Sequence, residues 1–391
     1  MTWRYSGWLG STGSQVMQNN KTILLIMSAL FIGGAEKQYR YIMEALAQKH
    51  RVHVLLLNQP LDGEELKTRE YTNDHKNITF YQLNGDAINE AKLGKVCAKL
   101  GKIRSFIIQW IWLRRFIKNH TVDIVMFTYV TQLLMIPLFK KNNIYTIYNE
   151  RNTGRQICDR EFKIKLLRKC DKVICNSDYA AEYIKNRTGI DTDIYRNGID
   201  IKPCQKRTHE GYHILVPARI SRIKNQMLVV QAIEALKEFL SKEEISAIRT
   251  FFAGSCEFED YKREIETEIK KNNSDIKLLG YVKCMDELYA NSDLIILPSY
   301  EEGTPNVLLE AYMHKIDVLV SNIPMNVSCC TNEEMTFSPD DAEQLAEKIA
   351  SCLRNRKSEE FFTSNFEYLI RNYGLDQMRQ RYLSLIDHVM E

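Results

Sequence analysis

The sequence has 391 residues, of which 45% are hydrophobic and 26% are charged, and its formal net charge is +3. This length predicts two or three domains with cores of ordinary size, and the small net charge gives no reason to expect nucleic-acid binding. The ten cysteines include no C-x-x-C pair. Free thiols in a reducing compartment are therefore expected, rather than a zinc site or a disulfide framework.

Residues 1–20 lack the continuous apolar core of a signal peptide and are predicted to form a disordered leader. No apolar run in the sequence has the length needed to cross a bilayer. Any membrane contact is therefore expected to be peripheral.

Strands and helices alternate from Lys21 onward. Short apolar runs bounded by polar turns predict buried strands, and helical segments fall between most of them, including one from about Ala35 to Gln48. This alternation is typical of a doubly wound α/β domain. The strands predicted for this first domain are 22–27, 52–57, 78–83, 124–127, 144–148 and 173–175.

The Gly33–Gly34 pair follows the first predicted strand, where glycine lets a backbone approach a ligand closely. The G-x-G-x-x-G spacing of a dinucleotide site is absent. The pair is either a simple turn or part of another kind of ligand site.

Residues 92–119 mix basic and apolar side chains and contain no acidic residue. Basic residues on one side of a helix, with Trp, Phe and Ile on the other, predict a helix lying in a membrane interface. The alternative is that the apolar face packs on the sheet and the lysines are merely solvated. The predicted membrane surface consists of Lys92, Lys95, Lys99, Lys102, Arg104, Trp110 and Trp112.

Two polar segments close the first domain. Glu150, Arg151 and Asn152 follow a strand and are interpreted either as part of a ligand site or as a salt-bridged loop. Asn197–Gly198 is a strong turn signal, and the polar residues 202–211 predict an interdomain linker.

The second predicted domain spans residues 212–373, with strands at 212–216, 250–254, 276–281, 294–297 and 317–321. Arg219 and Lys224 lie just beyond its first strand and before a helix. Two cations can converge there on a diphosphate, the Arg through its fork and the Lys as a point charge. The alternative is two exposed basic residues at a helix start.

The last two strands of this domain flank a predicted helix. Thr304 is a suitable N-cap and Pro305 suits the first helical position. A helix N-terminus attracts anions, and ligands of open α/β sheets bind beyond the strand carboxyl ends. The expected ligand is a nucleotide diphosphate.

Glu302 and Glu310 could form a glycosidase pair or contact different parts of one ligand. Eight residues of helix span roughly 12 Å, whereas paired glycosidase carboxyl groups lie about 5 to 9.5 Å apart. The spacing therefore favours two separate contacts with one long ligand. The remaining alternative is a solvated loop and an exposed helix residue.

In EGTPNVLLEA, Glu302 and Glu310 resemble the E-x7-E signature of the retaining glycosyltransferases of family four, which have the GT-B fold. YRNGID at 195–200 resembles the N-G-v-D turn that closes the first domain of that family. Arg219 and Lys224 match the basic residues of its G-R-x-s-x-x-K-g pattern.

Other positions depart from the family or match a subset of it. Ala218, Asn225 and Lys315 stand where the family has, or frequently has, glycine. Residues 150–152 resemble an S-E-R-N variant of some bacterial polysaccharide enzymes.

The resemblance implies an α/β protein of GT-B architecture, with two Rossmann-like domains facing a central cleft. The first domain is placed at 21–201, the linker at 202–211 and the second domain at 212–373. Residues 374–391, with a helix at roughly Leu375–Val389, are expected to cross back to the first domain.

The resemblance also implies residue roles. Glu302 would lie beside the transferred sugar, Glu310 would hold the ribose hydroxyls, and Arg219 and Lys224 would hold the diphosphate. Catalytic roles are assigned to Glu302, Arg219 and Lys224. The donor site would comprise Glu310, Thr304, Pro305, Asn306 and Val307, with Tyr281, Val282 and Lys283 beside the base, and the sugar or acceptor site would comprise Gly33, Gly34, Glu150, Arg151 and Asn152.

The expected function is retaining transfer of a sugar from a nucleotide diphosphate sugar, with a UDP-sugar favoured, to a lipid-linked acceptor in capsule or O-antigen assembly. No cofactor or metal is expected, since two cations and a helix end supply the positive field. The expected location is the cytoplasm, at the inner face of the membrane with its anionic lipids. The alternatives are a GT-B-like sugar-nucleotide epimerase and an inactive, membrane-associated interaction protein.

Overall fold

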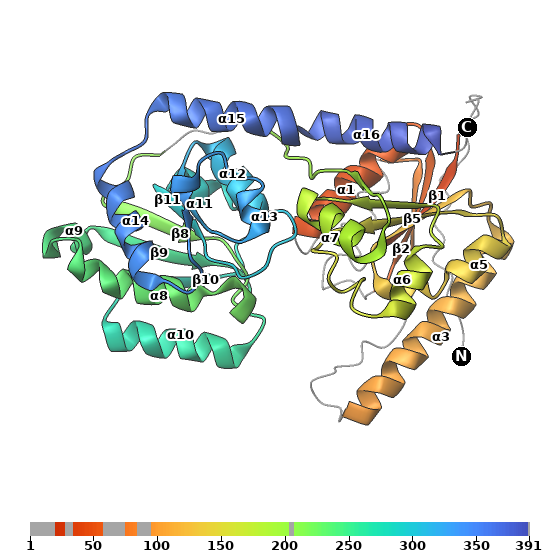
Figure 1. The fold of residues 1–391 in the computed structure, drawn as a ribbon, viewed down its shortest axis with the longest axis horizontal. Helices are drawn as coiled ribbons and strands as arrows, with labels where there is room; N and C mark the ends of the chain where they lie inside the picture. Colours follow the sequence, from red (N-terminus) through yellow and green to blue (C-terminus); the bar gives the residue numbers. More distant parts are fainter. Residues whose placement is uncertain (1–19, 28–33, 58–74, 84–94, 203–206, 390–391) are drawn as a thin grey trace. The chain divides into compact units, whose positions relative to one another are not determined.

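A computed structural model describes residues 20–27, 34–57, 75–83, 95–202 and 207–389 (Figure 1). The predicted leader lies outside these residues except for Asn20. The chain forms two compact units, the first running up to Gly198 and resuming at Leu375, the second spanning Ile199–Gly374. Each unit is described by itself.

Unit 1 is built on a parallel sheet of seven strands in the order β3-β2-β1-β4-β5-β6-β7. The order places consecutive strands on both sides of β1, as expected of a doubly wound sheet. The strands are β1 (Thr22–Met27), β2 (Arg51–Leu56), β3 (Ile78–Gln82), β4 (Ile124–Phe127), β5 (Tyr145–Glu150), β6 (Lys172–Cys175) and β7 (Asp193–Ile194).

Helices cover both faces of this sheet. They are α1 (Gly34–Ala47), α3 (Lys95–Asn119), α4 (Val130–Leu133), α5 (Ile136–Lys141), α6 (Glu161–Leu167), α7 (Asp178–Thr188) and α16 (Leu375–His388). Ile23 and Leu25 of β1 share a core cluster with α1 and α16, whereas Leu24 shares one with α3, α5 and α7. Alternate side chains of one strand therefore enter opposite layers, which explains why its sequence is continuously apolar.

Unit 2 is built on a parallel sheet of six strands in the order β10-β9-β8-β11-β12-β13. The strands are β8 (Tyr212–Val216), β9 (Ile248–Ala253), β10 (Ile276–Gly280), β11 (Leu294–Leu297), β12 (Asp317–Ser321) and β13 (Thr336–Phe337). This sheet also has its consecutive strands on both sides of the first one, so both units are Rossmann-like.

The helices of unit 2 also lie on both faces. They are α8 (Gln226–Ala235), α9 (Lys242–Ser246), α10 (Glu259–Asn272), α11 (Asp286–Ala290), α12 (Asn306–His314), α13 (Pro324–Val327), α14 (Ala342–Arg354) and α15 (Glu359–Tyr373), with short 3-10 turns η2 (Arg222–Lys224), η3 (Leu236–Glu238) and η4 (Glu333–Met335). One core layer contains α8, α10 and α14, and the other contains α11, α12 and α15.

The strand predictions are confirmed for β1, β4, β8, β11 and β12, whose bounds match residue for residue. The start of α12 was predicted wrongly. Pro305 occupies the N-cap position, no side chain caps the helix, and Asn306 is its first residue. Thr304 is buried one residue earlier, so its hydroxyl does not serve as the N-cap.

Candidate functional site

Most of the predicted donor residues lie on loops that follow parallel strands of unit 2. Arg219 and Lys224 follow β8, Tyr281 follows β10, and Glu302 follows β11. Because the carboxyl ends of parallel strands share one edge of a sheet, these loops lie at the same edge.

Backbone hydrogen bonds join these loops to one another. The N–H of Tyr300, after β11, donates to the carbonyl of Ile223 at 2.8 Å. The N–H of Ile220, after β8, donates to the carbonyl of Ser255 at 2.9 Å, and Gly254 donates to Gly280 at 2.8 Å. The edge is therefore a continuous hydrogen-bonded surface rather than a set of independent loops.

Gly254 allows the closest of these approaches. A Cβ atom at this position would lie 2.1 Å from the carbonyl oxygen of Ala218, which is shorter than any real contact. A residue with a side chain at 254 would push away the backbone that leads into Arg219. The glycine thus fixes the path of a loop that carries a predicted diphosphate ligand.

Lys224 and Glu302 form an ion pair, with the Lys224 Nζ 2.6 Å from Oε1 of Glu302. Both side chains are largely covered, being 18% and 12% exposed. The Ser299 hydroxyl donates to the same carboxylate oxygen at 2.6 Å and so helps to fix it. Two residues predicted to contact different parts of a donor are thus in direct contact with each other.

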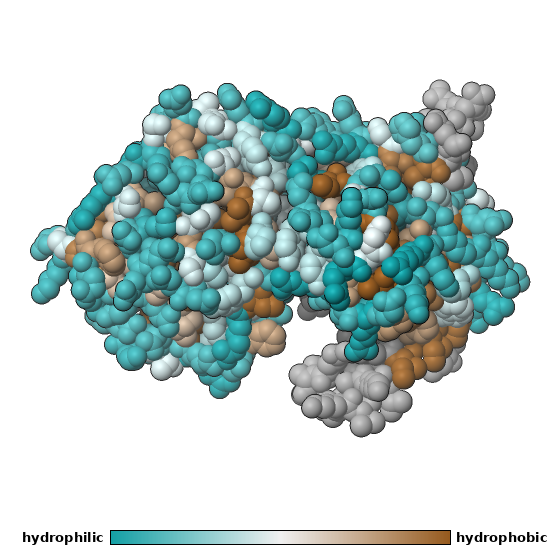
Figure 2. All heavy atoms as spheres, viewed as in Figure 1, coloured by the Kyte–Doolittle hydropathy of each residue, from teal (hydrophilic) through white to brown (hydrophobic). Residues whose placement is uncertain are grey.

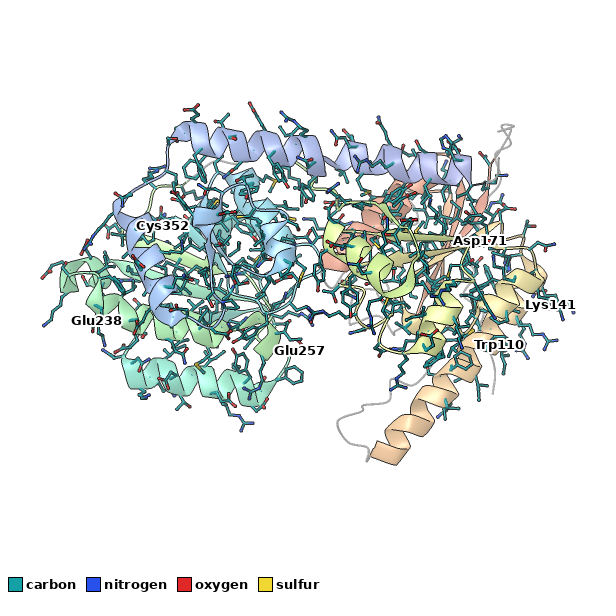
Figure 3. The ribbon with its side chains drawn as sticks, in the orientation of Figure 1. Trp110, Lys141, Asp171, Glu238, Glu257 and Cys352 are labelled. Carbon is teal, nitrogen blue, oxygen red and sulfur yellow. The ribbon has the colours of Figure 1, made fainter. Side chains whose placement is uncertain are left out.

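Arg219 is placed differently. It is 62% exposed and lies 3.4 Å from a carboxylate oxygen of Glu257, which is on the loop after β9 and is labelled in Figure 3. An exposed ion pair of this kind is weak, about 1 kcal/mol or less. The guanidinium can therefore exchange Glu257 for a phosphate at low cost.

Glu310 lies within α12 and receives a hydrogen bond of 2.6 Å from the hydroxyl of Tyr289 on α11. Glu302 and Glu310 thus have different partners within the protein. Burial, followed by the charge of Glu310, raises the pKa of Tyr289 well above its ordinary value, so the hydroxyl stays protonated and donates.

The predicted base-side residues follow β10. Tyr281 is 68% exposed, Lys283 is exposed, and Val282 is half-buried against the core layer of α12. Val307, in the first turn of α12, packs partly against the same layer.

Two positions that have glycine in the resembled family keep a left-handed backbone. Asn225 has φ of 52° at the start of α8, and Lys315 has φ of 54° at the end of α12. Asparagine tolerates this conformation, whereas for lysine it is strained by about 1 kcal/mol. Both positions thus adopt a left-handed backbone without glycine.

The predicted sugar or acceptor residues belong to unit 1. Gly34 is the first residue of α1, and Gly33 lies outside the described residues. Glu150 ends β5 and is buried, accepting hydrogen bonds from the Tyr148 hydroxyl at 3.0 Å and from the N–H of Asn152 at 2.8 Å. Burial raises its pKa, and the hydrogen bonds oppose that shift.

Arg151 is buried as well, and its Nη2 donates to the Oδ1 of Asn197. The side chain of Gln38 on α1 binds both the N–H and the carbonyl of Gly198 at 2.8 Å. The adjacent Asn149 donates to the Tyr382 hydroxyl of α16 at 3.2 Å. The E-R-N and N-G segments are therefore parts of one buried polar network, while Asn152 itself is exposed.

The predicted membrane surface falls on α3, whose described side chains begin at Ile103. Lys92 lies outside the described residues, and the side chains of Lys95, Lys99 and Lys102 do as well. Arg104 is exposed, whereas Trp110 and Trp112 are half-buried against the core of unit 1 (Figure 3).

Three isoleucines form the exposed apolar side of α3. Ile103, Ile107 and Ile111 are 52%, 50% and 42% exposed and follow one another at four-residue spacing. Figure 2 shows apolar side chains gathered over this helix. Within the described part of the chain, no helix is both long and apolar enough to cross a membrane.

Sequence reasoning missed Ser299, Tyr289 and Asn197 as partners of the predicted residues. Ser299 adjoins the predicted loop and could have been noticed, but Tyr289 precedes Glu310 by a strand and a loop, with no motif linking them. Among the described residues, no three His, Cys, Asp or Glu side chains lie together in a group that could hold a metal ion.

Comparison with known proteins identifies the class. The chain resembles, over 95% of its length and with a TM-score of 0.77, a sucrose-phosphate synthase from Thermosynechococcus elongatus at 15% identity, covering 99% of that chain. It also resembles Anabaena Alr3699/HepE in complex with UDP and glucose, with a TM-score of 0.74 over 94% of this chain and 99% of that one at 15% identity. These likenesses and the two parallel-sheet units define a GT-B fold.

Sequence comparison adds the activity class. A model of the family described as Glycosyltransferase Family 4 matches residues 32–202, and one described as Glycosyl transferases group 1 matches residues 200–367. The chain is 24% identical over 289 residues to the capsular polysaccharide biosynthesis glycosyltransferase CapH of Staphylococcus aureus, covering 69% of this chain and 79% of that protein.

A second relative matches over nearly the whole length. It is an α-1,4-N-acetyl-D-galactosaminyltransferase of Campylobacter jejuni that acts on an undecaprenol-linked saccharide, and it is 20% identical over 94% of this chain and 98% of its own. The protein is a glycosyltransferase, and the two family models match consecutive parts of its chain.

Proposed function

We propose that this glycosyltransferase moves a sugar, with retention of anomeric configuration, from a nucleotide diphosphate sugar to a lipid-linked saccharide in cell-surface polysaccharide assembly. A UDP-sugar is the favoured donor. The proposal rests on the arrangement of four residues at one edge of the unit 2 sheet. Loops and a helix that follow neighbouring parallel strands carry Arg219, Lys224, Glu302 and Glu310.

In this proposal the diphosphate lies on Arg219, Lys224 and the first turn of α12. The two cations and the exposed N–H groups of the helix stabilise the negative charge that develops on the leaving group. Both cations are paired with carboxylates, so in this proposal the phosphates exchange for Glu257 and Glu302 as they bind.

Glu302 would then be released beside the transferred sugar, and Glu310 would accept hydrogen bonds from the ribose hydroxyls. Tyr281, Val282 and Lys283 would lie beside the base. The residues of unit 1 have a separate proposed role. Gly34, Arg151 and Asn152 would contribute to the sugar or acceptor site, with Glu150 holding the loop through Tyr148 and the Asn152 N–H.

The lipid-linked acceptor is favoured by the surface of α3. Three exposed isoleucines and the exposed Arg104, Arg114, Arg115 and Lys118 lie on one helix. Exposed apolar side chains next to cations suit an anionic lipid surface, where each cation contributes about 1 kcal/mol. We propose that α3 holds the protein at the cytoplasmic face of the membrane.

Thermal unfolding with UDP, GDP and ADP, without added metal, tests the donor site. A bound nucleotide stabilises the fold by several kcal/mol when it is present at a hundredfold or more above its dissociation constant. One nucleotide is expected to raise the midpoint, and Lys224→Ala is expected to abolish the rise. No response to any of the three would overturn the proposed donor site.

Co-sedimentation with vesicles containing anionic lipid tests the membrane contact. Ile107→Asp is expected to reduce binding, whereas Ile370→Asp, on an isoleucine of α15 with 43% exposure, is expected to leave it unchanged. Equal binding by both variants would remove the membrane role of α3.

A further inference from the structure

Tyr289 connects the two helices that carry one end of the candidate donor site. Its hydroxyl lies 2.6 Å from Oε2 of Glu310, and its ring stacks on His314 with 4.9 Å between centroids and 22° between planes. Glu310 and His314 are one helical turn apart on α12, so a single tyrosine of α11 contacts both.

The surroundings of Tyr289 hold its ring in one position. The residue is 2% exposed and belongs to the core layer of α12, while Glu310 is half-buried. His314 is also buried, which lowers its pKa and keeps the imidazole neutral against the ring. The tyrosine is therefore held in place as a donor to the carboxylate.

A glutamate side chain loses rotamer freedom when it is fixed, and the Tyr289 hydroxyl holds Oε2 of Glu310 in place. A carboxylate has about four lone-pair sites, so it can accept several hydrogen bonds at the same time. A ligand that binds to an already ordered carboxylate does not have to order it.

We propose that Tyr289 is a positioning residue that orders Glu310 to receive the 2′- and 3′-hydroxyls of a nucleoside diphosphate, and so makes the site selective for ribonucleotides. The inference rests on the proposed function of the donor site. Tyr289 lies outside the E-x7-E segment, and its proposed role is in nucleotide selectivity, not in transfer of the sugar.

Calorimetry on the full chain tests this inference, with UDP and 2′,3′-dideoxy-UDP as probes. Tyr289→Phe is expected to weaken UDP binding about tenfold, because the nucleotide must then order the Glu310 side chain itself. Binding of the dideoxy nucleotide is expected to stay at the native value, because it has no hydroxyls for Glu310. The ratio of the affinity for UDP to the affinity for 2′,3′-dideoxy-UDP should therefore fall about tenfold.

Tyr312→Phe is the matched control. Tyr312 is a buried tyrosine of the same helix whose hydroxyl contacts Thr331 and the carbonyl of Cys329, not Glu310. It is expected to keep the native affinity ratio even if it lowers the unfolding temperature. In Glu310→Ala, adding Tyr289→Phe is expected to change UDP binding no further.

The outcomes separate the two proposals. A native ratio in Tyr289→Phe, or a further loss when it is added to Glu310→Ala, would overturn the positioning role and leave the proposed function standing. If the native chain bound none of UDP, GDP and ADP, the proposed donor site would fail and the positioning role with it. If the native chain bound GDP or ADP instead, the same comparison would be made with that nucleotide and its dideoxy form.

Discussion

Lys224 and Glu302 lie in contact, with 2.6 Å between the Nζ and Oε1 atoms, although they follow different strands of unit 2. In the proposed function, a phosphate oxygen of the donor takes the place of this carboxylate next to the ammonium. The carboxylate would then compete with the donor for the same cation, and its displacement would free Glu302 to act on the sugar.

Changing either member of this pair should alter nucleotide affinity in opposite directions. Lys224→Ala is expected to weaken UDP binding about tenfold or more, because one charge-assisted hydrogen bond is lost. Glu302→Gln is expected to tighten UDP binding several-fold while abolishing transfer, because a negative charge next to the phosphates is removed. Calorimetry measures both changes.

Arg222→Ala serves as the control for this pair. Arg222 is a nearby cation of the same turn, but it pairs with Glu264 at 2.6 Å, and UDP affinity should not change when it is removed. Weaker binding in Glu302→Gln would show that the two residues do not compete for one position.

The buried Arg151 of unit 1 makes Asn197 a sensitive position. Asn197→Ala removes the amide oxygen to which the Arg151 guanidinium donates. The unfolding free energy is expected to fall by about 2 to 3 kcal/mol. Arg196→Ala, next to it in sequence, removes an ion pair with Asp178 that is partly exposed, for which about 1 kcal/mol or less is expected. Urea unfolding compares them, and equal losses would be inconsistent with the buried network.

Lys315 ends α12 with a left-handed backbone and offers a stabilising substitution. Lys315→Gly is expected to raise the unfolding free energy by about 1 kcal/mol, since glycine adopts this conformation without strain. Asn273→Gly, at the same position of α10 with φ of 51°, should gain less, because asparagine already tolerates it. A loss of stability in Lys315→Gly would show that contacts of the lysine side chain outweigh the strain.

The buried His53 should make the stability of the protein depend on pH. It is buried between Tyr81, Phe116 and His120, and burial, together with the charges of His120 and Arg51, lowers its pKa to about 4. Between pH 6.5 and 4 the unfolded chain binds a proton at this residue and the folded protein does not. Stability is therefore lost as the pH falls through this window, by up to about 3 kcal/mol.

His53→Phe removes that contribution while keeping an aromatic ring in place. Urea unfolding at pH 7.5 and 4.5 should show a smaller loss in the variant than in the native protein. His50 and His314, whose pKa values burial also lowers, remain in both proteins and cancel in the comparison. Identical losses would mean that His53 is protonated in the folded state.

The strands were the most predictable part of the fold. A run such as Leu294–Leu297 is buried on both faces, so it is continuously apolar and its bounds can be read directly. The start of α12 was less predictable, because Thr304 has the right chemistry for an N-cap but the chain turns one residue later, at Pro305. The start of the helix is therefore set by the path of the loop and not by the preference of threonine for the N-cap position.

The candidate site was predictable as far as its motifs are local. Arg219, Lys224 and Glu302 were found from their positions after strands, but the ion pair between two of them depends on β8 and β11 being neighbours in the sheet. The exposed side of α3 was predicted only in part. Its tryptophans, which were assigned to the membrane surface, pack partly on the core, whereas Ile103, Ile107 and Ile111 are exposed.

The most direct test of the account is sugar transfer by the purified native chain. It would be incubated with UDP-linked hexoses and N-acetylhexosamines, a polyprenyl-diphosphate saccharide and a metal chelator, and UDP release and the anomeric configuration of the product would be followed by NMR. We expect UDP release that requires the acceptor, an anomeric configuration matching that of the donor, and loss of both UDP and the glycosylated product in Lys224→Ala. Inversion at the anomeric carbon, or UDP release by Lys224→Ala at the native rate, would contradict it.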